Sequence, residues 1–259
     1  MTALLAVVCG VVGLCIGSFL NVVIYRVPRK ESVVRPRSHC PSCQALIAER
    51  DNIPVVSWIL LRGRCRACGA RISPRYAVVE LGTAALFVAA AIRFGQSWSL
   101  PAFLVFFAAL LAISVIDIDC FLVPNRVLYP ALFIAAPLLV LAAAATGDRT
   151  ALVHALIGGV GGFGALLVVH LVSPRGMGFG DVRLAGLIGM MLGWLGLGYP
   201  VLGIFSGFLL ASIVGVGLIV TRVRTRKDPV PFGPFLAVGA VVAVLWGQAL
   251  LDAYSRRGA

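Results

Sequence analysis

The chain has 259 residues, of which 60% are hydrophobic and only 12% charged, and its mean hydropathy is +1.02. Soluble domains carry about 25% charged residues, so this composition argues against a soluble enzyme, a disordered chain or a secreted disulfide scaffold. It indicates an integral membrane protein. The 22 Lys and Arg exceed the 10 Asp and Glu, and we interpret this excess as a sign of membrane topology and not of nucleic-acid binding.

Apolar segments recur along the whole chain, each near the length of about 20 residues that crosses a bilayer as a helix. We therefore predict an all-α polytopic membrane protein with about eight transmembrane helices. The predicted spans are 3–25, 77–94, 101–116, 127–145, 152–173, 183–197, 199–221 and 232–251.

The polar segment between the first two spans, 26–76, holds eleven Lys and Arg against three acidic residues. The positive-inside rule makes this segment cytoplasmic. Eight spans with both termini outside then place 18 of the 22 basic residues on the cytoplasmic side. The chain divides into a first transmembrane helix (1–25), a cytoplasmic insertion (26–76) and a seven-helix membrane domain (77–259).

Four cysteines of the insertion form two C-x-x-C pairs that are separated by 21 residues, namely Cys40, Cys43, Cys65 and Cys68. This spacing is typical of a tetrahedral all-thiolate zinc site. The cytosol disfavours disulfides, and a loop with few core residues gains folding free energy from a metal. We predict a structural zinc; the alternative, a thioredoxin-like redox pair, lacks its strand and helix context.

Two carboxylates lie where polar residues meet the membrane, a costly position that usually marks function. Asp117 follows the apolar run 102–116, and Asp181 follows Gly178-Phe179-Gly180 and opens the next span. The predicted topology puts both at cytoplasmic ends of spans. If these ends adjoin, the two carboxylates form the pair that an aspartic protease uses to activate water and protonate an amide.

The residues alone leave two alternatives open at this site. Asp181 is also suited to capping a helix N-terminus in a flexible loop, and Asp119 is as suitable a partner as Asp117. The glycines before Asp181 permit positive φ angles and a close approach of the backbone to an extended substrate. Spacing does not decide among these readings.

Glycines repeat in the fifth and sixth spans, a pattern that predicts close helix packing without any ligand. They are Gly158, Gly159, Gly161, Gly162 and Gly164 in the fifth span, and Gly186, Gly189, Gly193 and Gly196 in the sixth.

Several motifs occur in a fixed order over nearly the whole chain. They are GSFLNVVIYRVP at 17–28, the two C-x-x-C pairs, NIPVVSW at 52–58, Arg75-Tyr76 with Glu80, Asp117 with Pro124-Asn125, Gly178-Phe179-Gly180-Asp181 and PFGPF at 231–235. In these motifs the chain resembles the type IV prepilin peptidases, bifunctional leader peptidase and N-methyltransferase enzymes of the GxGD aspartic protease class.

The resemblance implies that Asp117 and Asp181 are the catalytic pair. Gly178, Gly180, Asp119 and Pro124 would then form the supporting loops. Arg183 stands where the family often has lysine, which keeps the charge but changes the donor geometry. Glu80 and Asn21 match family positions whose roles the residues do not disclose; polar contacts between helices are the structural alternative.

The resemblance also implies an enzyme of the bacterial cytoplasmic (inner) membrane, with its active site at the cytoplasmic face. Such an enzyme removes the basic leader from type IV prepilin or pseudopilin precursors, after a glycine, and methylates the new N-terminus with S-adenosylmethionine as donor. It serves a type IV pilus or protein secretion, and its partners are these precursors and the lipid bilayer, without nucleic acid. The precursor, the oligomeric state and the donor pocket stay open, since no Rossmann-type glycine loop appears.

Two other functions compete with this interpretation. A proton-coupled transporter would use Asp117 and Asp181 as proton carriers, but such acids belong near the bilayer midplane and these lie at span ends. A non-catalytic scaffold would use the zinc loop to recruit partners, and it would tolerate Asn in place of both aspartates. Neither accounts for the ordered motifs.

Overall fold

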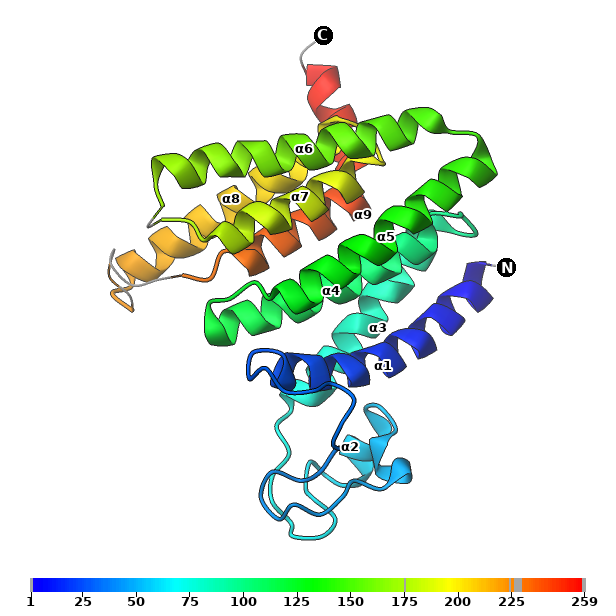
Figure 1. Cartoon of the computed structure of the whole chain (residues 1–259), viewed down its shortest axis with the longest axis vertical. Coiled ribbons are helices and arrows are strands. Elements are labelled where there is room, and N and C mark those ends of the chain that lie inside the picture. The colour runs from blue at the N-terminus through cyan, green and yellow to red at the C-terminus, as the bar shows by residue number, and fades with distance from the viewer. Residues whose placement is uncertain (1, 175, 224, 226–229, 258–259) are drawn as a thin grey trace. The chain divides into compact units, whose positions relative to one another are not determined.

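The structure is a computed structural model, and it describes residues 2–174, 176–223, 225 and 230–257. Over these residues it is helical, with no strand (Figure 1). The helices are α1 (Thr2–Arg26), η1 (Glu49–Asn52), α2 (Val56–Leu60), α3 (Arg75–Phe94), α4 (Leu100–Cys120), α5 (Asn125–Thr146), α6 (Arg149–Val172), α7 (Phe179–Gly193), α8 (Gly198–Val220) and α9 (Gly233–Arg257). The predicted all-α membrane fold is confirmed.

Each of the eight predicted spans corresponds to a helix, and seven of these are long and apolar enough to cross a membrane. The exception is α7, whose 15 residues reach only about 22 Å at 1.5 Å per residue. A hydrocarbon core is about 30 Å thick. The break between α7 and α8 confirms that the region 183–221 forms two helices.

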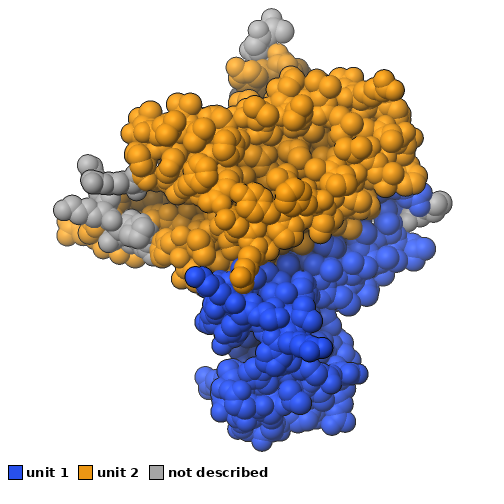
Figure 2. All heavy atoms as spheres, viewed as in Figure 1, with its two compact units in different colours: residues 1–96 blue, residues 97–259 orange. Residues whose placement is uncertain are grey.

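The chain separates into two compact units, residues 1–96 and 97–259, coloured blue and orange in Figure 2. Unit 1 contains α1 packed on α3, together with the insertion between them, which contains the four cysteines. Glycine permits the close approach of the two helices, because a Cβ on Gly17 would lie 2.6 Å from the Glu80 Cα. The segment between α1 and α3 has little regular structure, which fits its small number of core residues.

Unit 2 contains α4 to α9, and successive helices run in alternating directions (Figure 1). Of its helices that are long enough to span a membrane, α4 is the most buried, and it packs against α5 and α9. Three phenylalanines of α4, Phe103, Phe106 and Phe107, have no exposed surface. The alternation brings the end of α4 and the starts of α5, α7 and α9 to one end of the unit, and both aspartates are there.

The predicted close packing of the glycine-rich spans is confirmed where α6 meets α7. A Cβ built on Gly189 would overlap the carbonyl oxygen of Gly158, and one on Gly158 would overlap the carbonyl of Gly189. The other members do not all serve this contact, since a Cβ on Gly161 or Gly164 would meet nothing within 4 Å.

This geometry makes Gly189→Ala destabilising although alanine is the better helix former. The added methyl group must push apart two backbones, and overpacking of this kind costs about 1–3 kcal/mol. We expect the thermal unfolding midpoint in detergent to fall by several degrees. Gly161→Ala is the matched control and should leave the midpoint unchanged or raise it; equal midpoints for both variants would contradict the packing described.

Candidate active site

Asp117 lies in the last turn of α4, one turn before the helix ends. Phe121 ends the helix in the left-handed conformation, with φ of 51°, and its N–H bonds to the Asp117 carbonyl at 2.9 Å. The Asp117 side chain is 5% exposed. Its Oδ2 accepts a hydrogen bond of 2.9 Å from the backbone N–H of Gly233, the first residue of α9.

Asp181 lies in the first turn of α7, three residues after the N-cap residue Gly178. Its side chain is 8% exposed, and its Oδ1 is buried without a hydrogen-bond partner among the described residues. A buried carboxyl oxygen without a partner is unusual. It leaves a polar atom available for water or a substrate.

The structure brings these two aspartates together. Helix α9 packs against both α4 and α7, and the charge of Asp117 acts on the Asp181 carboxyl group. The loop after α4 also packs against the first turn of α7, because a Cβ on Gly180 would lie 2.8 Å from Val123 Cβ. The expected proximity is therefore present, while the catalytic role of the pair stays a prediction.

The supporting residues separate into buried and exposed members. Pro124 is buried at the N-cap of α5, whereas Asp119 is exposed. On a helix, side chains two residues apart point about 200° away from each other, so α4 turns Asp117 inward and Asp119 outward. Burial therefore identifies Asp117, and not Asp119, as the neighbour of Asp181.

The expected role of the glycines needs a correction. Gly178 has φ of −71°, and neither it nor Gly180 is among the described residues with positive φ. Gly180 is needed because a side chain would collide with Val123, which is a requirement of space and not of backbone conformation.

Arg183, in the same helix, contacts two neighbouring side chains. Its guanidinium donates to the Asn125 side chain and lies 4.9 Å from the centre of the Phe179 ring.

Sequence reasoning missed one group of this site, the backbone N–H of Gly233. The PFGPF motif at 231–235 was the available signal. Residue spacing could not predict the bond, however, because the backbone donor lies 116 residues from its acceptor. Glycine is required there because a Cβ would lie 2.9 Å from Asp117 Oδ2.

Gly233→Ala should therefore displace the Asp117 carboxyl group. If the pair acts as the aspartic protease that the sequence predicts, cleavage should slow by about 10- to 100-fold, since small misplacements of a reacting group carry costs of that size. Initial rates over a range of substrate concentrations would show the loss in kcat, with KM little changed. A variant with the rate of the unaltered protein would show that this contact does not position Asp117.

The four predicted cysteine ligands also come together, in unit 1. Their sulfur atoms all lie within 4.8 Å of one another, and the Cys40 and Cys68 sulfurs are 3.9 Å apart. Four thiolates at 2.3 Å from one zinc ion would be about 3.8 Å apart in a tetrahedron. The cluster is thus compatible with zinc.

The two C-x-x-C turns have the same backbone design. In each, the first cysteine's N–H bonds to a carbonyl five residues on, and its own carbonyl accepts from the residue after the second cysteine. That residue has positive φ in both turns, 60° at Gln44 and 70° at Gly69. Backbone hydrogen bonds from Cys43 and Ser42 lower the pKa of the Cys40 thiol to about 6, which favours the thiolate that binds metal.

Glu80 and Asn21 hold parts of unit 1 together. Glu80 is 7% exposed, and its Oε2 accepts a 2.7 Å hydrogen bond from the N–H of Val55. The Asn21 side chain donates to the carbonyl of Tyr76 at 3.0 Å. Asn21 thus joins α1 to α3, and Glu80 joins the 52–58 motif to α3.

Two family models match the chain. The Bacterial Peptidase A24 N-terminal domain matches residues 11–94, which include the cysteine cluster, and the Type IV leader peptidase family matches residues 104–220, which include both aspartates. No solved structure matches.

Curated relatives match over most of the chain. Proteins named prepilin leader peptidase/N-methyltransferase are 36% identical in Aeromonas hydrophila, 35% in Bacillus subtilis (strain 168) and 37% in Stutzerimonas stutzeri. The alignments cover 93%, 93% and 94% of this chain and 90%, 94% and 91% of those proteins. The chain, with its buried aspartate pair and its four-cysteine cluster, belongs to the type IV leader peptidase family.

Proposed function

We propose that this protein is a membrane aspartic endopeptidase that removes the basic leader from type IV prepilin or pseudopilin precursors. We propose further that it methylates the new N-terminus with S-adenosylmethionine. The observation that carries the peptidase is the pair of neighbouring buried carboxyl groups, Asp117 and Asp181, at one end of unit 2. The names of the relatives support both activities.

The contacts of the two carboxyl groups suggest how they divide the chemistry. Asp117 accepts a 2.9 Å hydrogen bond from the Gly233 N–H, which favours the charged carboxylate, so we assign it the ionised state. Asp181 has an oxygen without a partner and lies beside that charge, so we assign it the proton. Two neighbouring buried carboxyl groups share one proton more easily than they carry two charges.

In this mechanism Asp117 takes a proton from water as the water oxygen bonds to the scissile carbonyl carbon, and Asp181 gives its proton to the carbonyl oxygen. When the tetrahedral intermediate collapses, the C–N bond breaks and the leaving amine takes the proton from Asp117. Asp181 recovers its proton from the former carbonyl oxygen. The pair thus returns to its starting state without a metal in this step.

Membrane orientation follows from charge. Arg126, Arg183 and Arg222 belong to the same helix ends as the aspartates, and the positive-inside rule assigns these ends to the cytoplasm. We propose a multi-pass protein of the bacterial inner membrane with both termini outside. The apolar helix of a precursor would lie in the bilayer, with its leader at the cytoplasmic face.

The cysteine cluster is proposed to hold one structural zinc ion through Cys40, Cys43, Cys65 and Cys68. All four ligands are protein sulfurs, so the tetrahedral shell is closed and offers no position to a substrate. The metal would stabilise the insertion, in which few side chains of the segment 27–74 are buried.

Cleavage and methylation can be tested together on the purified protein. It would be incubated in detergent with a pilin-like precursor, with and without S-adenosylmethionine, and the products measured by mass spectrometry. We expect loss of the leader in both samples and the mass of one added methyl group only with the donor. An intact precursor would contradict the peptidase, and a cleaved product that stays unmethylated would contradict the methyltransferase alone.

A further inference from the structure

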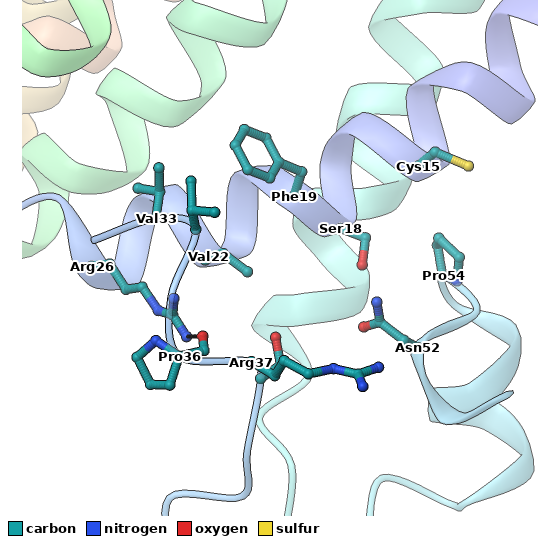
Figure 3. Close-up of a pocket in the computed structure, with 12 residues that line it drawn as sticks. Cys15, Ser18, Phe19, Val22, Arg26, Val33, Pro36, Arg37, Asn52 and Pro54 are labelled. Carbon is teal, nitrogen blue, oxygen red and sulfur yellow. Dashed lines mark hydrogen bonds between the residues drawn. The ribbon is translucent and has the colours of Figure 1, made fainter. Parts of the chain in front are cut away.

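Unit 1 contains a hollow of about 400 Å³ next to the cytoplasmic half of α1 (Figure 3). Three segments line it: α1, the chain from 33 to 38, and the chain from 52 to 54. Its volume lies within the range of about 300–1,000 Å³ that is typical of small-molecule sites. Neither the aspartate pair nor the cysteine cluster uses it.

One side of the hollow carries a buried positive charge. Arg26 is 7% exposed and donates to the carbonyls of Ser32 at 2.9 Å and Pro36 at 2.7 Å. No carboxylate of the described residues forms an ion pair with it. Buried charges are usually paired, so this guanidinium indicates a place for an anionic group.

A second arginine adds positive charge to another part of the hollow, near Asn52 (Figure 3). Arg37 lines the same hollow, and its ion pair with Glu49 has side chains that are 69% and 89% exposed. Exposed ion pairs contribute little, so Arg37 can turn to a ligand at small cost.

The hollow is also lined by neutral hydrogen-bonding side chains, one of which lies next to the acidic residue Glu80. Figure 3 shows Ser18 and Asn52 beside the space that Arg37 also borders. Ser18 lies next to the buried carboxyl group of Glu80. Phe19 and Val22 add apolar surface.

We propose that this hollow binds the methyl donor, S-adenosylmethionine, and this inference rests on the proposed methyltransferase activity. The donor is an amino acid with a carboxylate, a positively charged sulfonium and a nucleoside. Arg26 or Arg37 suits the carboxylate, and Ser18 and Asn52 suit the nucleoside's polar atoms. When bound, the donor supplies a methyl group whose S–C bond breaks as the amine lone pair forms the N–C bond and the amine proton passes to water.

A second hollow of unit 1 provides an internal comparison. It measures about 500 Å³ and is lined by Trp58, Arg62, Arg64 and Arg71 among others. It has basic residues, and neither hollow is lined by an acidic residue. Both hollows are thus positively charged and similar in volume, whereas only the first is lined by a buried arginine.

The test is equilibrium binding of radiolabelled S-adenosylmethionine to the full chain in lipid nanodiscs. Arg37→Ala and Asn52→Ala should each weaken binding about tenfold or more, the usual effect of losing a hydrogen bond to a charged or buried group. Arg71→Ala, the matched arginine of the second hollow, should bind within about twofold of the unaltered chain. Zinc content and thermal unfolding confirm that each variant is folded.

Each result decides a separate point. Equal affinity in all variants, or stronger loss in Arg71→Ala, overturns the location of the donor site. No saturable binding to the unaltered chain overturns the inference as well. Cleavage of the precursor, recorded in the same preparations, shows independently whether the proposed peptidase stands.

Discussion

Replacing either Asp117 or Asp181 with Asn should abolish precursor cleavage, with rates at least about 10³-fold below those of the unaltered protein. Asn keeps the volume of the side chain but neither accepts nor donates the proton that moves between water and the leaving amine. Both side chains are buried next to each other, so no solvent group can substitute for them. Initial cleavage rates in detergent would measure the loss.

Two further variants make this prediction specific. Asp252→Asn is the matched control, because Asp252 is exposed on α9, 19 residues from Gly233 and thus about 28 Å along the helix. It should keep the rate of the unaltered protein. Asp119→Asn tests the alternative partner: activity in Asp117→Asn together with inactivity in Asp119→Asn would move the pair to Asp119. Immunoblots of membranes would show that all variants are equally abundant.

Replacing Cys43 or Cys65 with Ser should unfold the insertion between α1 and α3. Structural zinc contributes about 10–16 kcal/mol in small zinc domains, and the insertion has too few buried side chains to compensate for that loss. We expect one zinc ion per chain in the unaltered protein and a large reduction in either variant, measured by elemental analysis. Limited proteolysis should then cut between residues 27 and 74, which resist cleavage in the metal-bound form.

The control for this experiment is Cys120→Ser. Cys120 is exposed at the end of α4 and does not belong to the cluster. It should retain the metal and the proteolytic resistance. A zinc content that stays unchanged in Cys43→Ser and Cys65→Ser would show that the four sulfurs do not hold the ion.

The sequence by itself determined the membrane class, the helices and the four cysteines that form the cluster. Hydropathy is a local property, so each apolar stretch predicted its own helix, and even the break between α7 and α8 was visible. The cysteine cluster was equally predictable from the C-x-x-C pairs. Each turn brings its own two sulfurs together, so only the two turns then have to meet. The motifs around Asp117 and Asp181 likewise identified the family.

Only the tertiary structure decided how these parts combine. Asp117 and Asp119 look alike in sequence, and the helical turn of about 100° per residue buries one and exposes the other. The Gly233 N–H reaches Asp117 across 116 residues, and Arg26 becomes a buried charge because the chain from 32 to 36 folds back over it. Such contacts depend on packing between distant segments, which cannot be predicted from local composition and residue spacing.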